Sequence, residues 1–515
     1  MQMIAGKNEI LIFLKLGLVA SVILLMVSPD SFTHDMFGRC DSSTFFMCGK
    51  AWMEGLLPYR DFADSKGLLL WLIYGIGYLL SPHDYLGVLV VSCLWYSFIF
   101  YFIFLTARVF LKDDRWAFLA AVLQGFFFFD PYIHYEVRAE DFAMLMIVAS
   151  LYLTVRHLYG SQCDKDLLQS CFAIGFLMGA LFLIKFNIIM MAAIFPFFLL
   201  IAFVRSFSRL IAMLGAMLGG FLIILLPFAL YVMWQGIGGD FVREYIVNTM
   251  LTVNRHASYL GEVFRTKFLL ESQFIKGPGL LWMSLSGALL LIPLLKRWVY
   301  FPLLVCLWFF VLCSMHGVWP YYYGSCLFIP VFGIVAFLLL LKSWGRVEHW
   351  LKRTWVMASA GVLSVAGVVA VNYQTQDNHD QLWYVDSQSR QDYYTCLYLV
   401  SQVENPTIMY FSILGPSVDL WTHAKPACRY FVSQNGSTAV MDQQQMRVVK
   451  YRLADFVVTS VNDIYQDYIE SRGYRKYSCK GFGVSLFSKR PLKLPPDDFY
   501  MSPTDVLMKR NKSAR

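Results

Sequence analysis

The sequence predicts a polytopic α-helical membrane protein with a small α/β domain at its C-terminal end, and three observations support this prediction. Hydrophobic residues make up 58% of the 515-residue chain and charged residues only 15%, against about 45–50% and about 25% in soluble domains. The apolar residues come in repeated runs of about 15 to 25, the length needed to cross the hydrocarbon core of a bilayer. After residue 371 short β-rich segments alternate with amphipathic, helix-like segments, a pattern typical of a small α/β domain.

Eleven apolar runs are candidate membrane spans. The first one lacks a small-residue cleavage site directly after it, so we interpret it as a retained helix and not as a signal peptide. The stretch 67–80 is too short for a comfortable crossing and is predicted to be re-entrant or interfacial. The candidate spans are residues 10–28, 86–110, 116–130, 141–155, 169–184, 188–204, 210–234, 279–295, 299–315, 320–341 and 354–371.

The basic residues predict the orientation of these spans. The net charge is +8, but Lys and Arg lie in short clusters between apolar runs and form no single basic stripe, which argues against nucleic-acid binding. If 67–80 does not cross, the clusters near residues 108–115, 156–165, 205–209, 296–297 and 342–353 all face the cytoplasm. The N-terminus is then cytoplasmic, and everything after residue 371 lies outside.

The expected organisation is a transmembrane domain over 1–371, an extracytoplasmic α/β domain over 372–490 and a disordered tail over 491–515, which is rich in Pro, Lys and Asp. Strands are expected at 407–411, 455–460 and 483–488. Two small-residue pairs, Gly175 with Gly179 and Gly215 with Gly219, predict close helix contacts. The eleven cysteines show no zinc-type spacing. Cys428 with Cys479 is a candidate disulfide if the C-terminal side is oxidising.

Three loops are predicted to lie outside, at 29–66, 130–140 and 235–278, and we expect most of the chemistry there. In the first loop Asp41 precedes a helix predicted over 44–53. It is either the N-terminal cap of that helix or a carboxylate that takes a proton from an incoming nucleophile.

Further along the same loop, charged residues gather just before the apolar stretch 67–80. Such residues either form a solvated loop or hold the phosphate of a lipid whose tail lies in the bilayer. These charged residues are Arg60, Asp61, Asp64 and Lys66.

The second loop places Arg138, Glu140 and Asp141 at the mouth of the next helix, where ionisable groups are either paired with one another or functional. Lys185, between two short spans, requires an anionic partner, and a phosphate is one candidate. In the third loop, basic and aromatic side chains either line a groove for sugar and phosphate or form a charged amphipathic surface. The residues singled out there are Tyr245, Arg255, His256 and Tyr259.

The order of these parts resembles one family. An acidic residue early in the first loop is followed by the pattern Gly-x-x-Pro-Tyr-Arg-Asp-x-x-Asp-x-Lys-Gly over residues 55–67, and then by Arg138-x-Glu140. This order resembles the GT-C membrane glycosyltransferases, and within them the bacterial relatives of protein O-mannosyltransferases and lipid A aminoarabinose transferases. The resemblance covers residues 1–340, and many bacterial members also end in a small outward domain.

The resemblance implies that a hexosyl or pentosyl group moves from a polyprenyl-phosphate carrier to a glycan, lipid or protein acceptor on the outer face of the bacterial inner membrane. It implies that Asp41 is the general base of a single inverting displacement and that Glu140, with Asp141, is the supporting acid. The carrier phosphate would be held by Lys66, Arg60 and Lys185. Asp64, which orients Lys66, and Asp61 and Arg138 would support the site.

The sequence departs from the family pattern at two places. Lys66 is followed by Gly67-Leu68, where many relatives have proline, and Asp41 is followed by Ser42-Ser43 instead of a second acid. The paired acids of metal-dependent relatives are therefore incomplete, and an obligatory divalent metal is not favoured. Two alternative functions stay open at this point, a secondary transporter and a polymerase or ligase of lipid-linked glycans.

Overall fold

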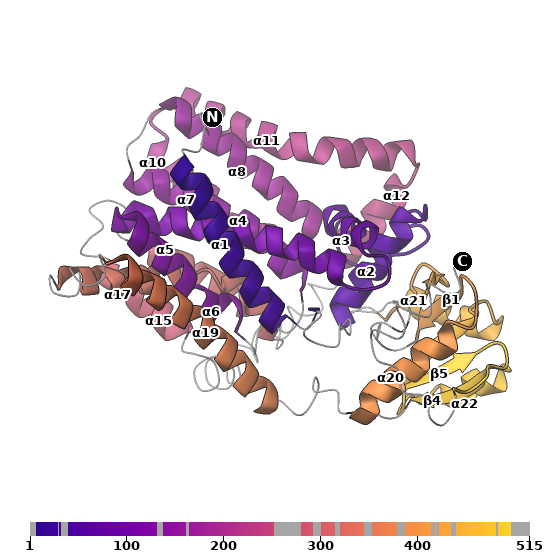
Figure 1. Cartoon of the computed structure of the whole chain (residues 1–515). Coiled ribbons are helices and arrows are strands. Elements are labelled where there is room, and N and C mark those ends of the chain that lie inside the picture. Colours follow the sequence, from indigo (N-terminus) through magenta and orange to yellow (C-terminus); the bar gives the residue numbers. More distant parts are fainter. Residues whose placement is uncertain are drawn as a thin grey trace.

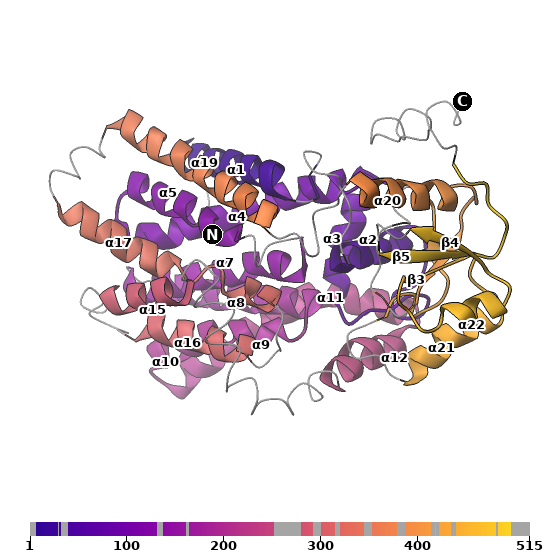
Figure 2. The same cartoon turned by 90° about the horizontal axis from the view of Figure 1, so that it is seen from below.

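The fold is a bundle of membrane-type helices with a compact α/β domain at one end (Figures 1 and 2). It is described here from a computed structural model. The structure describes residues 7–28, 30–31, 40–130, 137–160, 164–251, 280–291, 300–314, 320–344, 353–378, 387–411, 413, 418, 422–433, 439–479 and 483–495.

Each of the eleven candidate spans coincides with one helix or with two consecutive helical segments. Among the described residues, six helical segments are long and apolar enough to cross a membrane. The helices that match the candidate spans are α1 (Lys7–Val27), α4 (Leu86–Leu111), α5 (Asp114–Leu123), α6 (Gly125–Phe128), α7 (Ala139–Tyr159), α8 (Asp164–Ile184), α9 (Ile188–Ala192), α10 (Ile194–Phe203), α11 (Phe207–Trp234), α15 (Leu280–Leu291), α16 (Phe301–Ser314), η4 (Pro320–Cys326), α17 (Val331–Ser343) and α19 (Thr354–Asn378).

Basic residues mark the end of the bundle remote from the α/β domain. Arg108, in the last turn of α4, lies 3.2 Å from the Glu9 carboxylate of α1, and Lys342 of α17 donates a 2.9 Å hydrogen bond to the Leu111 carbonyl. The beginning of α1 and the last turns of α4 and α17 therefore meet. The opposite end carries α2 (Cys40–Met53), α3 (Leu68–Leu80) and the α/β domain (Figure 1).

Helix α3 is the apolar stretch whose role the sequence left ambiguous. At its start, the Gly67 amide donates a 3.0 Å hydrogen bond to the carbonyl of Ile184, the last residue of α8. Near its end, a Cβ on Gly77 would lie 2.6 Å from the Val88 side chain in the first turn of α4. Both ends of α3 thus lie at the α2 end of the bundle, so α3 does not cross it, as the orientation of the basic clusters predicted.

Close packing of α8 on α11 depends on glycine, although only partly on the glycines that the sequence indicated. A Cβ on Gly175 would overlap the Met217 carbonyl, and a Cβ on Gly179 would overlap the Ile224 side chain. On α11, however, Gly215 has open space around its Cβ position, and the close approach occurs at Gly220, against the Phe172 carbonyl. The prediction of close contact is confirmed for the α8 pair and wrong for Gly215.

The C-terminal domain is a five-stranded mixed sheet in the order β2-β1-β3-β5-β4. The strands β2, β1 and β3 are parallel, whereas β5 is antiparallel to both β3 and β4. The expected α/β domain and its three predicted strands are confirmed. The elements are α20 (Ser387–Val400), β1 (Thr407–Tyr410), β2 (Lys425–Pro426), α21 (Ala439–Lys450), β3 (Phe456–Ser460), α22 (Gln466–Ser471), β4 (Arg475–Cys479) and β5 (Val484–Ser488).

The boundaries of this domain differ from the expected ones. Helix α19 continues to Asn378, so the boundary expected after residue 371 falls inside a helix. At the other end, Lys493 exchanges backbone hydrogen bonds with the Gln402 side chain, so the first residues of the expected tail contact the domain. Residues 496–515 lie outside the described residues.

The predicted disulfide between Cys428 and Cys479 is wrong. Cys428 is a free thiol, whereas Cys396 on α20 is disulfide-bonded. Cys428 packs with Met409, Val457 and Phe487 in an apolar cluster of the domain. Its environment explains why it acts as a small hydrophobic residue, and burial raises the pKa of its thiol to about 12.

Candidate functional site

Asp41 and Arg138 join the first turns of two helices. Asp41 lies in the first turn of α2, with its Oδ2 atom 3.9 Å from Nε of Arg138, which directly precedes α7. The Asp41 side chain keeps 20% of its surface exposed, whereas that of Arg138 keeps only 6%. Because α2 begins at Cys40, Asp41 lies inside the helix and not at the cap position before it. A carboxylate there interacts favourably with the helix dipole and still reaches solvent.

Glu140 and Lys185 form a second pair, between the first turn of α7 and the end of α8. The Lys185 ammonium donates to Oε1 of Glu140, and the two side chains are 12% and 5% exposed. Asp141, the neighbouring acid, contacts different partners. It accepts a 2.8 Å hydrogen bond from the Arg138 amide and another from the Tyr96 hydroxyl, so it fixes the start of α7.

Lys66 lies beside the first turns of α2. Its ammonium is 3.5 Å from Oδ2 of Asp64 and 5.2 Å from the ring centroid of Phe45, one turn after Asp41. The hydrogen bond from Gly67 to Ile184 places the loop that carries Lys66 next to the residue before Lys185. A side chain at Gly67 would overlap the Leu183 carbonyl, so this close approach requires glycine.

The site therefore combines residues that are far apart in the sequence. Their formal charges cancel, and each cation lies next to a carboxylate. An anionic ligand at this place would meet positive groups that are already ordered by acidic neighbours. The residues brought together are Asp41, Asp64, Lys66, Arg138, Glu140 and Lys185.

Tyr59 shapes the loop that carries Lys66. Its backbone has a φ of 63°, which is uncommon for a residue other than glycine. Its hydroxyl donates a 2.8 Å hydrogen bond to the Lys66 carbonyl. The centroid of its ring lies 4.7 Å from the ring centroid of Trp71. Asp61 closes the beginning of the same loop by accepting a 2.7 Å hydrogen bond from the Leu57 amide.

The residues expected in the third loop are only partly described. Tyr245 is fully buried among aromatic rings, and its hydroxyl donates to the Phe182 carbonyl, so in this structure it is a packing residue. Arg255, His256 and Tyr259 lie outside the described residues.

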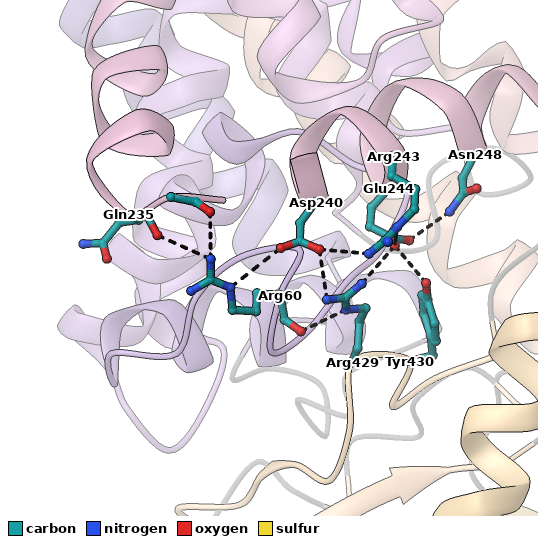
Figure 3. Close-up of polar contacts among 9 residues, drawn as sticks. Arg60, Gln235, Asp240, Arg243, Glu244, Asn248, Arg429 and Tyr430 are labelled. Carbon is teal, nitrogen blue, oxygen red and sulfur yellow. Dashed lines mark hydrogen bonds and ion pairs between the residues drawn. The ribbon is translucent and has the colours of Figure 1, made fainter. Parts of the chain in front are cut away.

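Arg60 lies in a different group of charges from Lys66. Its guanidinium donates a 2.8 Å hydrogen bond to the Gly236 carbonyl, and its Nε atom is 3.7 Å from Asp240 (Figure 3). Figure 3 also shows Glu244 and Arg429 in this group, neither of which the sequence singled out as a site residue. Only a folded chain brings them together, because Arg429 belongs to the C-terminal domain. Among the described residues, no group of His, Cys, Asp or Glu could hold a metal ion.

Comparison with known proteins identifies the fold. No protein-family model and no curated protein sequence matches the chain. Among solved structures, the chain is similar to ArnT from Cupriavidus metallidurans, both bound to undecaprenyl phosphate (TM-score 0.55, 11% identity, 94% of this chain and 99% of that chain) and in the apo state (0.57, 12%, 94% and 98%). The chain has the fold of the GT-C membrane glycosyltransferases.

A second GT-C structure is also similar, at a lower score. It is the archaeal oligosaccharyltransferase AglB from Archaeoglobus fulgidus, with a TM-score of 0.45, 12% identity and coverage of 96% of this chain and 75% of that chain. The GT-C fold predicted from residues 1–340 thus extends over nearly the whole chain, including the C-terminal domain, because both ArnT comparisons cover 94% of it.

Proposed function

We propose that the chain transfers a sugar from a polyprenyl-phosphate carrier to a glycan, lipid or protein acceptor, at the membrane face where α2 and the C-terminal domain lie. The observation that carries this proposal is the convergence of Asp41, Arg138, Glu140, Lys185 and Lys66 at one end of a GT-C fold. A lipid phosphate as ligand is supported by the similar ArnT structure, which is bound to undecaprenyl phosphate.

In this proposal Asp41 is the general base. Its carboxylate takes the proton from the acceptor hydroxyl, and the acceptor oxygen attacks the anomeric carbon from the side opposite the phosphate. The new glycosidic bond forms as the bond to the phosphate oxygen breaks, so the configuration inverts. The phosphate leaves with the electron pair as polyprenyl phosphate. The guanidinium of Arg138 lies 3.9 Å from this carboxylate and holds it at the start of α2.

Lys66 and Lys185 hold the carrier phosphate and stabilise the negative charge that develops on it as it leaves. Asp64 orients Lys66, and Glu140 keeps Lys185 in place. Arg60 was expected at the phosphate as well, but its contacts with Gly236 and Asp240 favour a supporting role in the loop.

The location that fits this function is the bacterial inner membrane, with the N-terminus in the cytoplasm and the C-terminal domain outside. Two observations support it. Cys396 is disulfide-bonded, which is typical of an oxidising compartment. Basic residues such as Arg108, Lys112 and Lys342 gather at the opposite end of the bundle, as is typical of a cytoplasmic face.

The test is mass spectrometry of surface glycans and lipid-linked sugars from cells that express wild type or Asp41→Asn at matched levels. We expect the variant to lose one sugar from an acceptor and to accumulate the donor, with transfer lowered by about 10²- to 10⁴-fold, the usual contribution of a general base. Undecaprenyl phosphate binding by the purified variant should persist, because Asp41 does not hold the phosphate in this proposal.

Unchanged profiles, under conditions where deleting the gene alters them, would refute the role of Asp41. The other functions have different signatures. A polymerase would extend the acceptor by many sugars instead of one, and a transporter would carry radiolabelled sugar into vesicles without forming a new glycosidic bond.

A further inference from the structure

Residues 422–430 of the C-terminal domain contact two elements that carry residues of the proposed active site, α2 and the loop before α3. Within the domain this segment is firmly held. It contains β2, which pairs with β1; the Ala427 amide donates a 2.9 Å hydrogen bond to the Ile408 carbonyl; and the Gln445 side chain donates a 2.8 Å hydrogen bond to the Tyr430 carbonyl. The segment is therefore fixed relative to the rest of the domain. The elements of the helix bundle that it contacts are fixed relative to the domain as well.

The beginning of the 422–430 segment contacts α2, the helix that carries Asp41. The fully buried Lys50 donates to the Thr422 carbonyl. Directly after the last residue of α2, Oε1 of Glu54 lies 3.8 Å from Nδ1 of His423 and accepts a 2.9 Å hydrogen bond from Tyr78.

The end of the 422–430 segment contacts the loop that carries Lys66, residues 57–66, which we call the Lys66 loop. The Ala63 amide donates a 2.8 Å hydrogen bond to the Arg429 carbonyl, and Nε of Arg429 donates a 2.9 Å hydrogen bond to the Arg60 carbonyl. Ala63 is buried against Tyr430 and Met441 of the domain. The backbone of this loop is thus held at two points, three and six residues before Lys66.

The Arg429 guanidinium also reaches the beginning of the third loop. It lies 3.0 Å from Asp240 and 3.3 Å from Glu244, and Glu244 is almost fully buried (Figure 3). The Tyr430 hydroxyl donates a 2.8 Å hydrogen bond to Glu244 as well. Burial, with the nearby Glu244 charge, raises the pKa of this hydroxyl to about 12, so it keeps its proton at neutral pH.

We infer that Arg429 is a positioning residue of the active site, which sets the Lys66 loop against α2 and thereby sets the affinity for the carrier phosphate. Its planar guanidinium donates hydrogen bonds to the Arg60 carbonyl, to Asp240 and to Glu244 at the same time. The single ammonium of lysine cannot reach all three acceptors in this geometry. The part of this inference that concerns affinity rests on the proposed function, in which Lys66 binds the phosphate. The part that concerns loop order does not.

The experiment uses the full-length chain in lipid nanodiscs, as wild type, Arg429→Ala, Arg429→Lys and Lys66→Ala. Arg472→Ala is the matched control, because Arg472 is exposed on the same domain and packs on Tyr468. Two quantities are measured for each variant. They are hydrogen–deuterium exchange of the peptide that covers residues 57–66 and the dissociation constant for undecaprenyl phosphate.

We expect Arg429→Ala to speed exchange in residues 57–66 and to weaken binding of undecaprenyl phosphate by about tenfold, within the range typical of coupling between distinct sites. Arg429→Lys should give an intermediate effect, and Arg472→Ala should match wild type. Glu244 keeps hydrogen bonds from Arg243, Tyr430 and Asn248 in the Arg429→Ala variant, so we expect the domain to stay folded.

The inference is overturned if Arg429→Ala leaves both the exchange of residues 57–66 and the affinity unchanged. It is also overturned if exchange rises uniformly over the whole chain, because Arg429 would then stabilise the fold without positioning the loop. Failure of the proposed function looks different. Lys66→Ala would then bind undecaprenyl phosphate as wild type does, while the exchange data would still decide whether Arg429 orders the loop.

Discussion

At the scale of single residues, the candidate site consists of charges that neutralise one another. Lys185 contacts Glu140, and Lys66 lies near Asp64, in places where both members of each pair are mostly buried. Charges removed from water lose hydration and need a partner, so the acids hold the lysines in place before a ligand arrives. In the proposed function, the carrier phosphate must then compete with these carboxylates. We therefore expect the acids to lower the affinity of the site for phosphate while they order its lysines.

This competition predicts the effect of Glu140→Gln. The amide removes the negative charge next to Lys185, so we expect undecaprenyl phosphate to bind severalfold more tightly. The same change disrupts a buried ion pair and should lower the free energy of unfolding by up to about 3 kcal/mol. Binding to the purified protein and its thermal denaturation in detergent would measure the two effects.

The control for Glu140→Gln is Asp467→Asn, which removes one negative charge in the first turn of α22, in the C-terminal domain. It should change neither quantity. Weaker binding by Glu140→Gln would contradict the competition and would indicate that Glu140 contributes directly to the phosphate site.

At the scale of elements, several helices hold the site by close backbone approach. A Cβ on Gly49 of α2 would lie 2.5 Å from the Gly75 amide nitrogen of α3, and Gly67 allows the start of α3 to meet the end of α8. The α8–α11 contact uses glycine in the same way. Small residues at such crossings let helices approach in a membrane, where the hydrophobic effect drives no association between them.

The α8–α11 contact provides a prediction with an internal control. Gly175→Ala places a methyl group against the Met217 carbonyl, so we expect the midpoint of thermal denaturation in detergent to fall, with a cost of about 1 to about 3 kcal/mol for overpacking. Gly215→Ala has open space and should leave the midpoint unchanged or raise it slightly, since alanine favours helix more than glycine does. Equal effects of the two substitutions would show that α8 and α11 do not pack as described.

At the scale of the whole molecule, the two ends of the helix bundle differ. One end gathers the basic residues near Arg108 and Lys342, and the other gathers α2, α3 and the C-terminal domain (Figure 1). The candidate site lies at the same end as that domain, which contacts both α2 and the Lys66 loop. The domain is therefore attached to two of the elements that carry residues of the proposed site.

This arrangement predicts the topology of the protein in the membrane. A fluorescent protein that folds only in the cytoplasm should be active when fused after Lys112, and an alkaline phosphatase that is active only outside should be active when fused after Val400. Each reporter should be inactive at the other position. The reverse pattern would invert the orientation and would place the proposed transfer on the cytoplasmic side.

The sequence by itself determined the apolar helices, the α/β class of the C-terminal domain and the residue types of the first two loops, and it predicts the orientation of the basic clusters. Composition and run length are enough for this, because a bilayer imposes one helix length and one charge asymmetry. The strand β4 escaped prediction because its residues, Arg475 to Cys479, form a polar edge of the sheet and lack an apolar run.

Only the tertiary structure decided which of these residues act together. Glu140 and Asp141 are adjacent and chemically similar, yet one faces Lys185 and the other fixes the start of α7, because successive helical residues point about 100° apart. Contacts between Arg429 and the Lys66 loop join residues more than three hundred positions apart. No local pattern encodes such a pairing, since it depends on how the C-terminal domain packs against the membrane helices.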